Sequence, residues 1–125
     1  MTTVVLVPGL MCDDTSWQPV LSSLSSTFDC QVIDHGLANT LPQMAQQLLA
    51  QAPERFALAG HSMGGRVALE VMRLAPERVT HLALFDTGYL PKAPGAAGEE
   101  EVRKRMALLE LARTQGVRAM ASEWV

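Results

Sequence analysis

The sequence predicts an α/β fold in which a doubly wound parallel sheet of about four strands carries helices on both faces. Three observations lead to this prediction. Strand-like and helix-like segments alternate along the chain with short connections, an order typical of parallel sheets. The strand-like segments contain continuous apolar runs, which is the pattern of strands covered on both faces. Apolar residues make up 48% of the 125 residues, enough for one domain with a real core.

Four segments are predicted to be strands. The first, TVVLVPG, is a β-branched run closed by a Pro-Gly turn. The second, DCQVIDHG, is weaker, whereas the third and fourth contain the apolar runs FALA and LALF. In chain order the four segments are 3–9, 29–36, 55–60 and 78–86.

The first helix is predicted over residues 13–28. Thr15 and Gln18 have the spacing of a capping box, in which two side chains satisfy free N–H groups at the start of a helix. Asp13 and Asp14 stand at the beginning of the same segment and are expected to cap it.

Two further helices follow at 39–53 and 63–77. Thr40 and Gln43 repeat the capping-box spacing at the start of the second helix. Pro76 is expected to end the third helix, because proline cannot continue the hydrogen-bonded ladder.

The character of the chain changes after the fourth strand. Residues 87–98 are rich in glycine, proline and alanine and are predicted to form a linker or loop. Residues 99–125 have a helical pattern that is broken at Gly116. We therefore expect an α/β core over 1–89 and a separate helical segment over 90–125.

Composition excludes several functional classes. The formal net charge is −3 and no run of lysine or arginine occurs, so neither a nucleic-acid surface nor a polybasic membrane patch is expected. No signal peptide and no apolar stretch of membrane-spanning length is apparent, which favours a cytoplasmic protein. Cys12 and Cys30 are accordingly expected to be reduced thiols.

The most informative motif is G-x-S-x-G over residues 60–64, at the junction of the third strand and the third helix. A sharp turn there would expose the Ser62 hydroxyl at the carboxyl edge of the sheet, where α/β folds bind ligands. The start of the helix favours developing negative charge, and the N–H of Met63 could donate to an oxyanion. Tight packing alone is the competing explanation. A phosphate-binding loop is excluded, because Arg66 and Val67 stand where Lys and Ser or Thr are required.

A second oxyanion donor is expected from the loop after the first strand, VPGLMCDD. Gly9 allows the backbone to turn sharply, and the N–H of Leu10 is the predicted donor. Met11 is predicted to line the substrate pocket beside it.

The motifs VVLVPGL, GHSMGGRVALE and LALFDTG together resemble the first half of an α/β-hydrolase-fold protein, in particular the small esterase-like members. The resemblance covers residues 3–89. It implies that Ser62 is the nucleophile, that the Leu10 and Met63 amides hold the oxyanion, and that a helical cap begins after Asp86.

The base and acid of a catalytic triad are harder to find. In this fold the acid and then the histidine follow the serine, but no histidine follows His81. His61 is expected to line the site wall without acting as the base, and His35 is at the correct edge of the sheet but is more simply a loop residue. Asp86 is a candidate acid, with a role in capping a turn as the alternative.

The sequence thus predicts a serine hydrolase that cleaves small-molecule esters or other acyl compounds through an acyl-enzyme, with no cofactor or metal. Little turnover is expected from these residues alone, because the base is missing. The remainder of a longer hydrolase, or a second copy, is expected to cover the apolar fourth strand.

Two alternatives stay open at this point. The first is a non-catalytic binding or interaction protein on the same scaffold, which would explain the missing histidine. The second is a small regulatory domain, although the sequence has no acidic cluster or phosphate site to support it.

Overall fold

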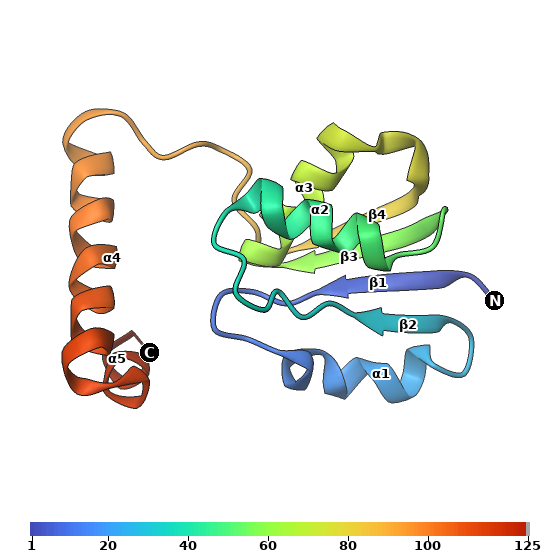
Figure 1. Ribbon diagram of the computed structural model, residues 1–125, viewed down its shortest axis with the longest axis horizontal. Helices are drawn as coiled ribbons and strands as arrows, with labels where there is room; N and C mark the ends of the chain where they lie inside the picture. Colours follow the sequence, from blue (N-terminus) through green and yellow to red (C-terminus); the bar gives the residue numbers. More distant parts are fainter. Residues whose placement is uncertain (125) are drawn as a thin grey trace. The chain divides into compact units, whose positions relative to one another are not determined.

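The computed structural model describes residues 1–124 and divides into two compact units, residues 1–89 and the residues from Leu90 onward. The first unit contains one sheet of four parallel strands in the order β2-β1-β3-β4 (Figure 1). The doubly wound fold predicted from the sequence is therefore confirmed. The strands are β1 (Thr3–Val7), β2 (Asp29–Val32), β3 (Phe56–His61) and β4 (Val79–Phe85).

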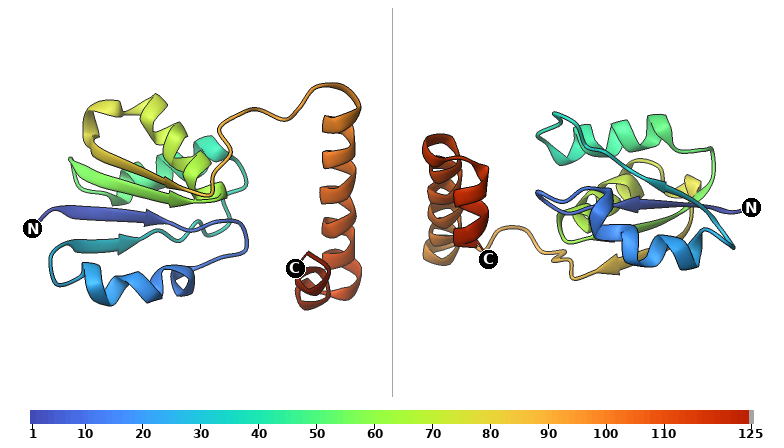
Figure 2. Two further views of the ribbon diagram at one scale, coloured as in Figure 1. Left: turned by 180° about the vertical axis from the view of Figure 1, so that it is seen from behind. Right: turned by 90° about the horizontal axis from the view of Figure 1, so that it is seen from below.

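Helices cover both faces of the sheet, as Figures 1 and 2 show. Helix α1 (Gln18–Leu24), with the short 3₁₀ helix η1 (Asp14–Trp17) before it, lies on one face. Helices α2 (Leu41–Gln51) and α3 (Met63–Leu74) lie on the other. Helix α3 ends before Pro76, as predicted, and the 3₁₀ helix η2 (Pro76–Arg78) leads into β4.

The helix starts confirm one predicted cap and correct another. The Thr40 side chain accepts a hydrogen bond from the Gln43 N–H at 3.2 Å, so the predicted cap of α2 is present. At η1 the capping residue is Asp13, whose carboxylate accepts the Thr15 N–H at 2.9 Å. The cap predicted at Asp13 is therefore confirmed, whereas the capping box predicted at Thr15 was wrong, because the chain enters a 3₁₀ turn whose cap lies two residues earlier.

The main core lies between the sheet and helices α2 and α3. Alternate residues of β1 and β3 point to this side, and Val5, Val7, Phe56 and Leu58 are all at most 1% exposed. A smaller cluster on the α1 side contains Leu6, Trp17 and Ala59. The two clusters bury β1 and β3 on both faces, and these strands lead into the loop after Val7 and the turn at Ser62.

Strand β4 is covered much less than β1 and β3. It pairs with β3 alone, and Leu82, Leu84 and Phe85 are 39%, 40% and 50% exposed. On the α1 side a groove of about 650 Å³ runs between η1, α1 and β4, and its lining is mostly apolar. Trp17 and Phe85 meet in this groove in an edge-to-face contact, with ring centroids 6.1 Å apart.

The second unit consists of helices α4 (Gly95–Gln115) and α5 (Val117–Trp124). The predicted break at Gly116 is present, and this residue has a φ of 96°. Helix α4 begins four residues before the predicted start at residue 99, because Gly95, Ala96 and Ala97 continue the helix into the expected linker. None of the helices in residues 1–124 is both long enough and apolar enough to span a bilayer.

Candidate functional site

Ser62 lies in the turn between β3 and α3, and its backbone is strained. Its φ of 55° and ψ of −119° form a combination that residues with a side chain rarely adopt, at a cost of about 1–3 kcal/mol. The residue is exposed and directly precedes the first helical residue, Met63. The chain therefore bends abruptly at Ser62, as the G-x-S-x-G pattern predicts.

The glycines around Ser62 allow this bend by close backbone contact. A Cβ atom on Gly60 would come within 2.7 Å of the Gly65 Cα atom and would also collide with the Gly64 carbonyl. A Cβ atom on Gly64 would collide with the Val7 carbonyl at the end of β1. Only glycine fits at either position, so the start of α3 presses directly against the centre of the sheet.

Three hydrogen bonds hold the main chain of the Ser62 turn. The Ser62 N–H donates to the Phe85 carbonyl at 3.0 Å, extending the pairing of β3 with β4. The Ser62 carbonyl accepts the Gly65 N–H at 3.0 Å and the Thr87 hydroxyl at 3.2 Å. The role of Thr87 was missed at the sequence level, since residues 87–98 carry only a loop signal.

The loop after β1 lies beside Ser62. A Cβ atom built on Gly9 would lie 3.2 Å from the Ser62 Cβ atom. The loop turns through a hydrogen bond from the Cys12 N–H to the Gly9 carbonyl at 3.1 Å, and Met11 has a φ of 60°. Leu10, the predicted second oxyanion donor, is therefore next in the chain to a residue that contacts the serine turn.

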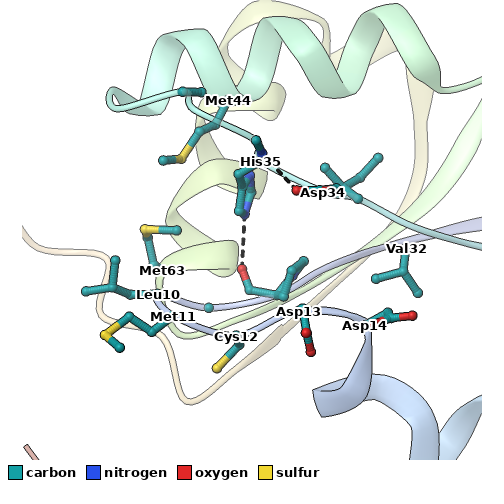
Figure 3. Close-up of a pocket in the computed structure, with 15 residues that line it drawn as sticks. Leu10, Met11, Cys12, Asp13, Asp14, Val32, Asp34, His35, Met44 and Met63 are labelled. Atoms are coloured by element: carbon teal, nitrogen blue, oxygen red, sulfur yellow. Dashed lines mark hydrogen bonds between the residues drawn. The ribbon is translucent and has the colours of Figure 1, made fainter. Parts of the chain in front are cut away.

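A cavity of about 570 Å³ opens between this loop and the segment after β2 (Figure 3). Leu10, Met11 and Met63 gather at one end of it in Figure 3. Asp14 and Asp34 lie toward the other end. The apolar end of the cavity, which contains Met63, therefore lies next to the Ser62 turn, and the two carboxylates lie at the far end.

Asp13 also lines this cavity, but its carboxylate is committed to the helix start. The Thr15 backbone N–H and then the Thr15 hydroxyl hold the pKa of Asp13 below its ordinary value. An ionised Asp13 therefore stabilises η1 at neutral pH.

His35 ties two sides of the cavity together. Its Nε2 atom lies 3.2 Å from the Pro8 carbonyl, whereas its Nδ1 atom is buried without a hydrogen-bond partner (Figure 3). If Nε2 carries the proton and donates it to Pro8, Nδ1 is the ring's lone-pair nitrogen. His35 therefore anchors the loop that carries Leu10 and makes no contact with the serine.

The other candidate residues, all of them among the described residues, make no hydrogen bond to the Ser62 hydroxyl. His61 lines the groove on the α1 side, and His81 contacts the neighbouring Thr80 hydroxyl. Asp86 is exposed and has a φ of 51°. Across residues 1–124 no hydrogen bond joins the Ser62 hydroxyl to a histidine or a carboxylate.

The part of the chain that is described contains neither a disulfide nor a metal-binding cluster. Cys12 and Cys30 are both free thiols. No group of three histidine, cysteine or acidic side chains within residues 1–124 is arranged to hold a metal ion.

Comparison with known families decides the classification. A family model described as "Putative esterase" matches residues 26–107, which is well over half of the chain. The chain belongs to this esterase family. The resemblance to α/β hydrolases drawn from the sequence motifs is thereby confirmed.

Curated relatives of this esterase-family chain are longer proteins. It is 36% identical over 87 residues to a pimeloyl-[acyl-carrier protein] methyl ester esterase of Aliivibrio salmonicida, covering 63% of this chain and 33% of that one. The enzyme of the same name from Pectobacterium carotovorum is 38% identical over 89 residues, covering 65% and 35%. The esterase-family chain thus spans about a third of the length of these relatives.

Proteins of known structure share the fold of this chain. A thermophilic esterase from Thermogutta terrifontis superposes with a TM-score of 0.76 and 29% identity, covering 98% of this chain and 48% of that one. A carboxylesterase structure from Nitrososphaera gargenis has a TM-score of 0.75 with the same coverage. At 20% identity the latter likeness shows the fold alone.

Proposed function

We propose that the protein is a serine hydrolase that cleaves carboxylic esters through an acyl-enzyme, with Ser62 as the nucleophile. The observation that carries the proposal is the strained, exposed Ser62 at the start of α3. Strained backbone of this kind is concentrated at functional sites. The relatives named above, which are methyl ester esterases, support an ester as the substrate class.

The chemistry follows from the position of the turn. The Ser62 oxygen adds to the ester carbonyl carbon, and the negative charge develops on the former carbonyl oxygen. The Met63 N–H at the helix start and the Leu10 N–H from the facing loop donate to that oxygen. The carbon–oxygen bond to the alcohol breaks, the alcohol takes up a proton, and water then releases the carboxylic acid and restores Ser62.

The proton of Ser62 must go to a base, and residues 1–124 place no histidine against the hydroxyl. We infer that the base and its orienting acid come from protein beyond these residues, either further hydrolase chain or a second copy. The partly exposed β4 is a suitable surface for such protein to pair with, because its outer edge has unpaired backbone groups. These residues alone are expected to turn over substrate very slowly.

Labelling with a fluorophosphonate probe tests the nucleophile. The probe reacts with an activated serine, and the oxyanion donors retain part of the activation when the base is absent. We expect slow labelling at Ser62, located by mass spectrometry, and none in Ser62→Ala. Ser122→Ala, which removes an exposed hydroxyl in α5, is the matched control and should label like the wild type.

Equal labelling of the wild type and Ser62→Ala would overturn the nucleophile assignment. The non-catalytic alternative is favoured by one observation, the lack of a base at Ser62 within residues 1–124. It predicts that neither the protein alone nor the protein joined to further hydrolase chain labels at Ser62.

A further inference from the structure

We propose that Thr87 is a positioning residue for Ser62, and that its hydroxyl locks the strained main chain of the serine turn. This inference rests on the proposed function. Thr87 follows β4 and is half-buried. Its Oγ1 atom lies 3.2 Å from the Ser62 carbonyl and 3.0 Å from the Phe85 carbonyl.

Both carbonyls belong to the hydrogen-bond network of the turn. The Phe85 carbonyl accepts the Ser62 N–H, and the Ser62 carbonyl accepts the Gly65 N–H. A threonine hydroxyl has one proton to donate, so it bonds to one carbonyl at a time or is shared between them. The bond to the Ser62 carbonyl holds the exit of the turn into α3, and the bond to the Phe85 carbonyl holds the group that accepts the Ser62 N–H at the entry from β3.

Thr87 also packs against the helix start. A Cβ atom on Gly65 would lie 2.5 Å from the Thr87 methyl carbon and would collide with its hydroxyl oxygen. The preceding residue, Asp86, has a φ of 51°, a left-handed conformation at the point where the chain leaves β4. The hydrogen bond between Thr87 and Ser62 therefore lies between two residues with positive φ, Ser62 and Asp86.

This arrangement has a chemical consequence. The angle at which the Ser62 hydroxyl meets a carbonyl carbon depends on the backbone of Ser62, and so does the direction of the Met63 N–H. A displacement of about 1 Å in such groups can cost roughly a hundredfold in rate. Thr87 therefore acts on the rate of acylation through the main chain, without touching the substrate.

The test compares Thr87→Val, which keeps the shape but loses the hydroxyl, with Thr87→Ser, which keeps the hydroxyl. In fluorophosphonate labelling we expect Thr87→Val to lower the maximal rate of acylation at Ser62 by about tenfold to a hundredfold, with unchanged probe affinity. Thr87→Ser should recover most of the rate. Thr80→Val, which removes an exposed hydroxyl elsewhere on β4, should not change it.

Amide hydrogen exchange gives a second readout that does not depend on reactivity. Loss of one hydrogen bond should speed exchange of the Gly65 amide by about fivefold, with no change at core amides such as Leu58. A uniform increase at all amides would mean that Thr87 only stabilises the fold, and would overturn the proposal.

The two proposals fail in different ways. If Ser62 labels and Thr87→Val labels at the wild-type rate, the serine assignment stands and the role of Thr87 is wrong. If Ser62 never labels, the proposed function is wrong, and selective exchange at Gly65 alone decides whether Thr87 holds the turn. Unchanged exchange at Gly65 in Thr87→Val overturns that role as well.

Discussion

Strands β1 and β4 have the same kind of sequence and very different surroundings. The run VVLV in β1 has Val5, Leu6 and Val7 at most 1% exposed. The run LALF in β4 has Leu82, Leu84 and Phe85 between 39% and 50% exposed. β1 pairs on both edges and is covered on both faces, whereas β4 pairs with β3 alone.

The composition of a strand indicates the environment for which the strand is suited. The elements packed around the strand determine whether the folded protein provides that environment. A continuous apolar run suits a strand covered on both faces. On the α1 side β4 instead borders a groove of about 650 Å³, with Phe85 in its wall. The same substitution should therefore have unequal effects in the two strands.

The largest difference in lost stability between the two strands is expected when an apolar residue is replaced by aspartate. Val5, Leu58 and Leu82 lie in one row across β1, β3 and β4. Val5→Asp buries an unpaired carboxylate and should cost more than about 4 kcal/mol, a large part of the roughly 5–15 kcal/mol by which domains are stable. Leu82→Asp leaves the charge near water and should cost about 1 kcal/mol. Circular dichroism with urea denaturation measures both, and equal losses would contradict the comparison.

A smaller difference in lost stability is expected when residues of the same row are replaced by alanine. Leu58→Ala opens a cavity in the main core and should lower the free energy of unfolding by about 2–5 kcal/mol. Leu82→Ala removes a side chain that is already 39% exposed and should lower it by about 1 kcal/mol. A cost at Leu82 as large as that at Leu58 would show that β4 is fully covered in solution.

Self-association is a further consequence expected of the exposed strand β4. An exposed apolar strand edge favours pairing with another copy. Sedimentation of the protein over a range of concentrations should show weak association, and Leu84→Lys on β4 should reduce it. Leu109→Lys, on the comparably exposed α4, is the control and should reduce it less. A larger reduction from Leu109→Lys would move the association surface to the second unit.

The smallest effect concerns the cap of η1. The hydrogen bonds from Thr15 lower the pKa of Asp13 below its ordinary value of 3.8. Its stabilising contribution is therefore present above that pH and is lost as the pH falls through the lowered pKa. The stability difference between the wild type and Asp13→Ala should shrink in acid. Asp13→Asn, which caps without ionising, should not show the same dependence.

The sequence predicted the order of strands and helices because apolar periodicity and turn residues are local signals. Thr40 illustrates this, since its cap depends only on the three residues that follow. At the first helix the sequence offered both Asp13 and Thr15 as caps, two residues apart, and the local pattern could not choose between them. The early start of α4 at Gly95 was missed because alanine and glycine carry no periodic signal.

Within the candidate site, the bend at Ser62 was predictable because G-x-S-x-G determines which positions must lack a Cβ atom. The contacts of His35 with Pro8 and of Thr87 with Ser62 join residues 27 and 25 positions apart. No local pattern encodes such pairs, because they depend on how β1, β2, β3 and β4 come together. No base could be predicted for Ser62, and within residues 1–124 no histidine or carboxylate is hydrogen-bonded to its hydroxyl.

One hydrogen bond connects the Ser62 turn to the exposed strand β4. The amide of Ser62 is held by the carbonyl of Phe85, the last residue of the least protected strand. Fraying at that end of β4 would release the residue on which the chemistry is proposed to depend. The reactivity proposed for Ser62 should thus rise and fall with the order of the strand beside it.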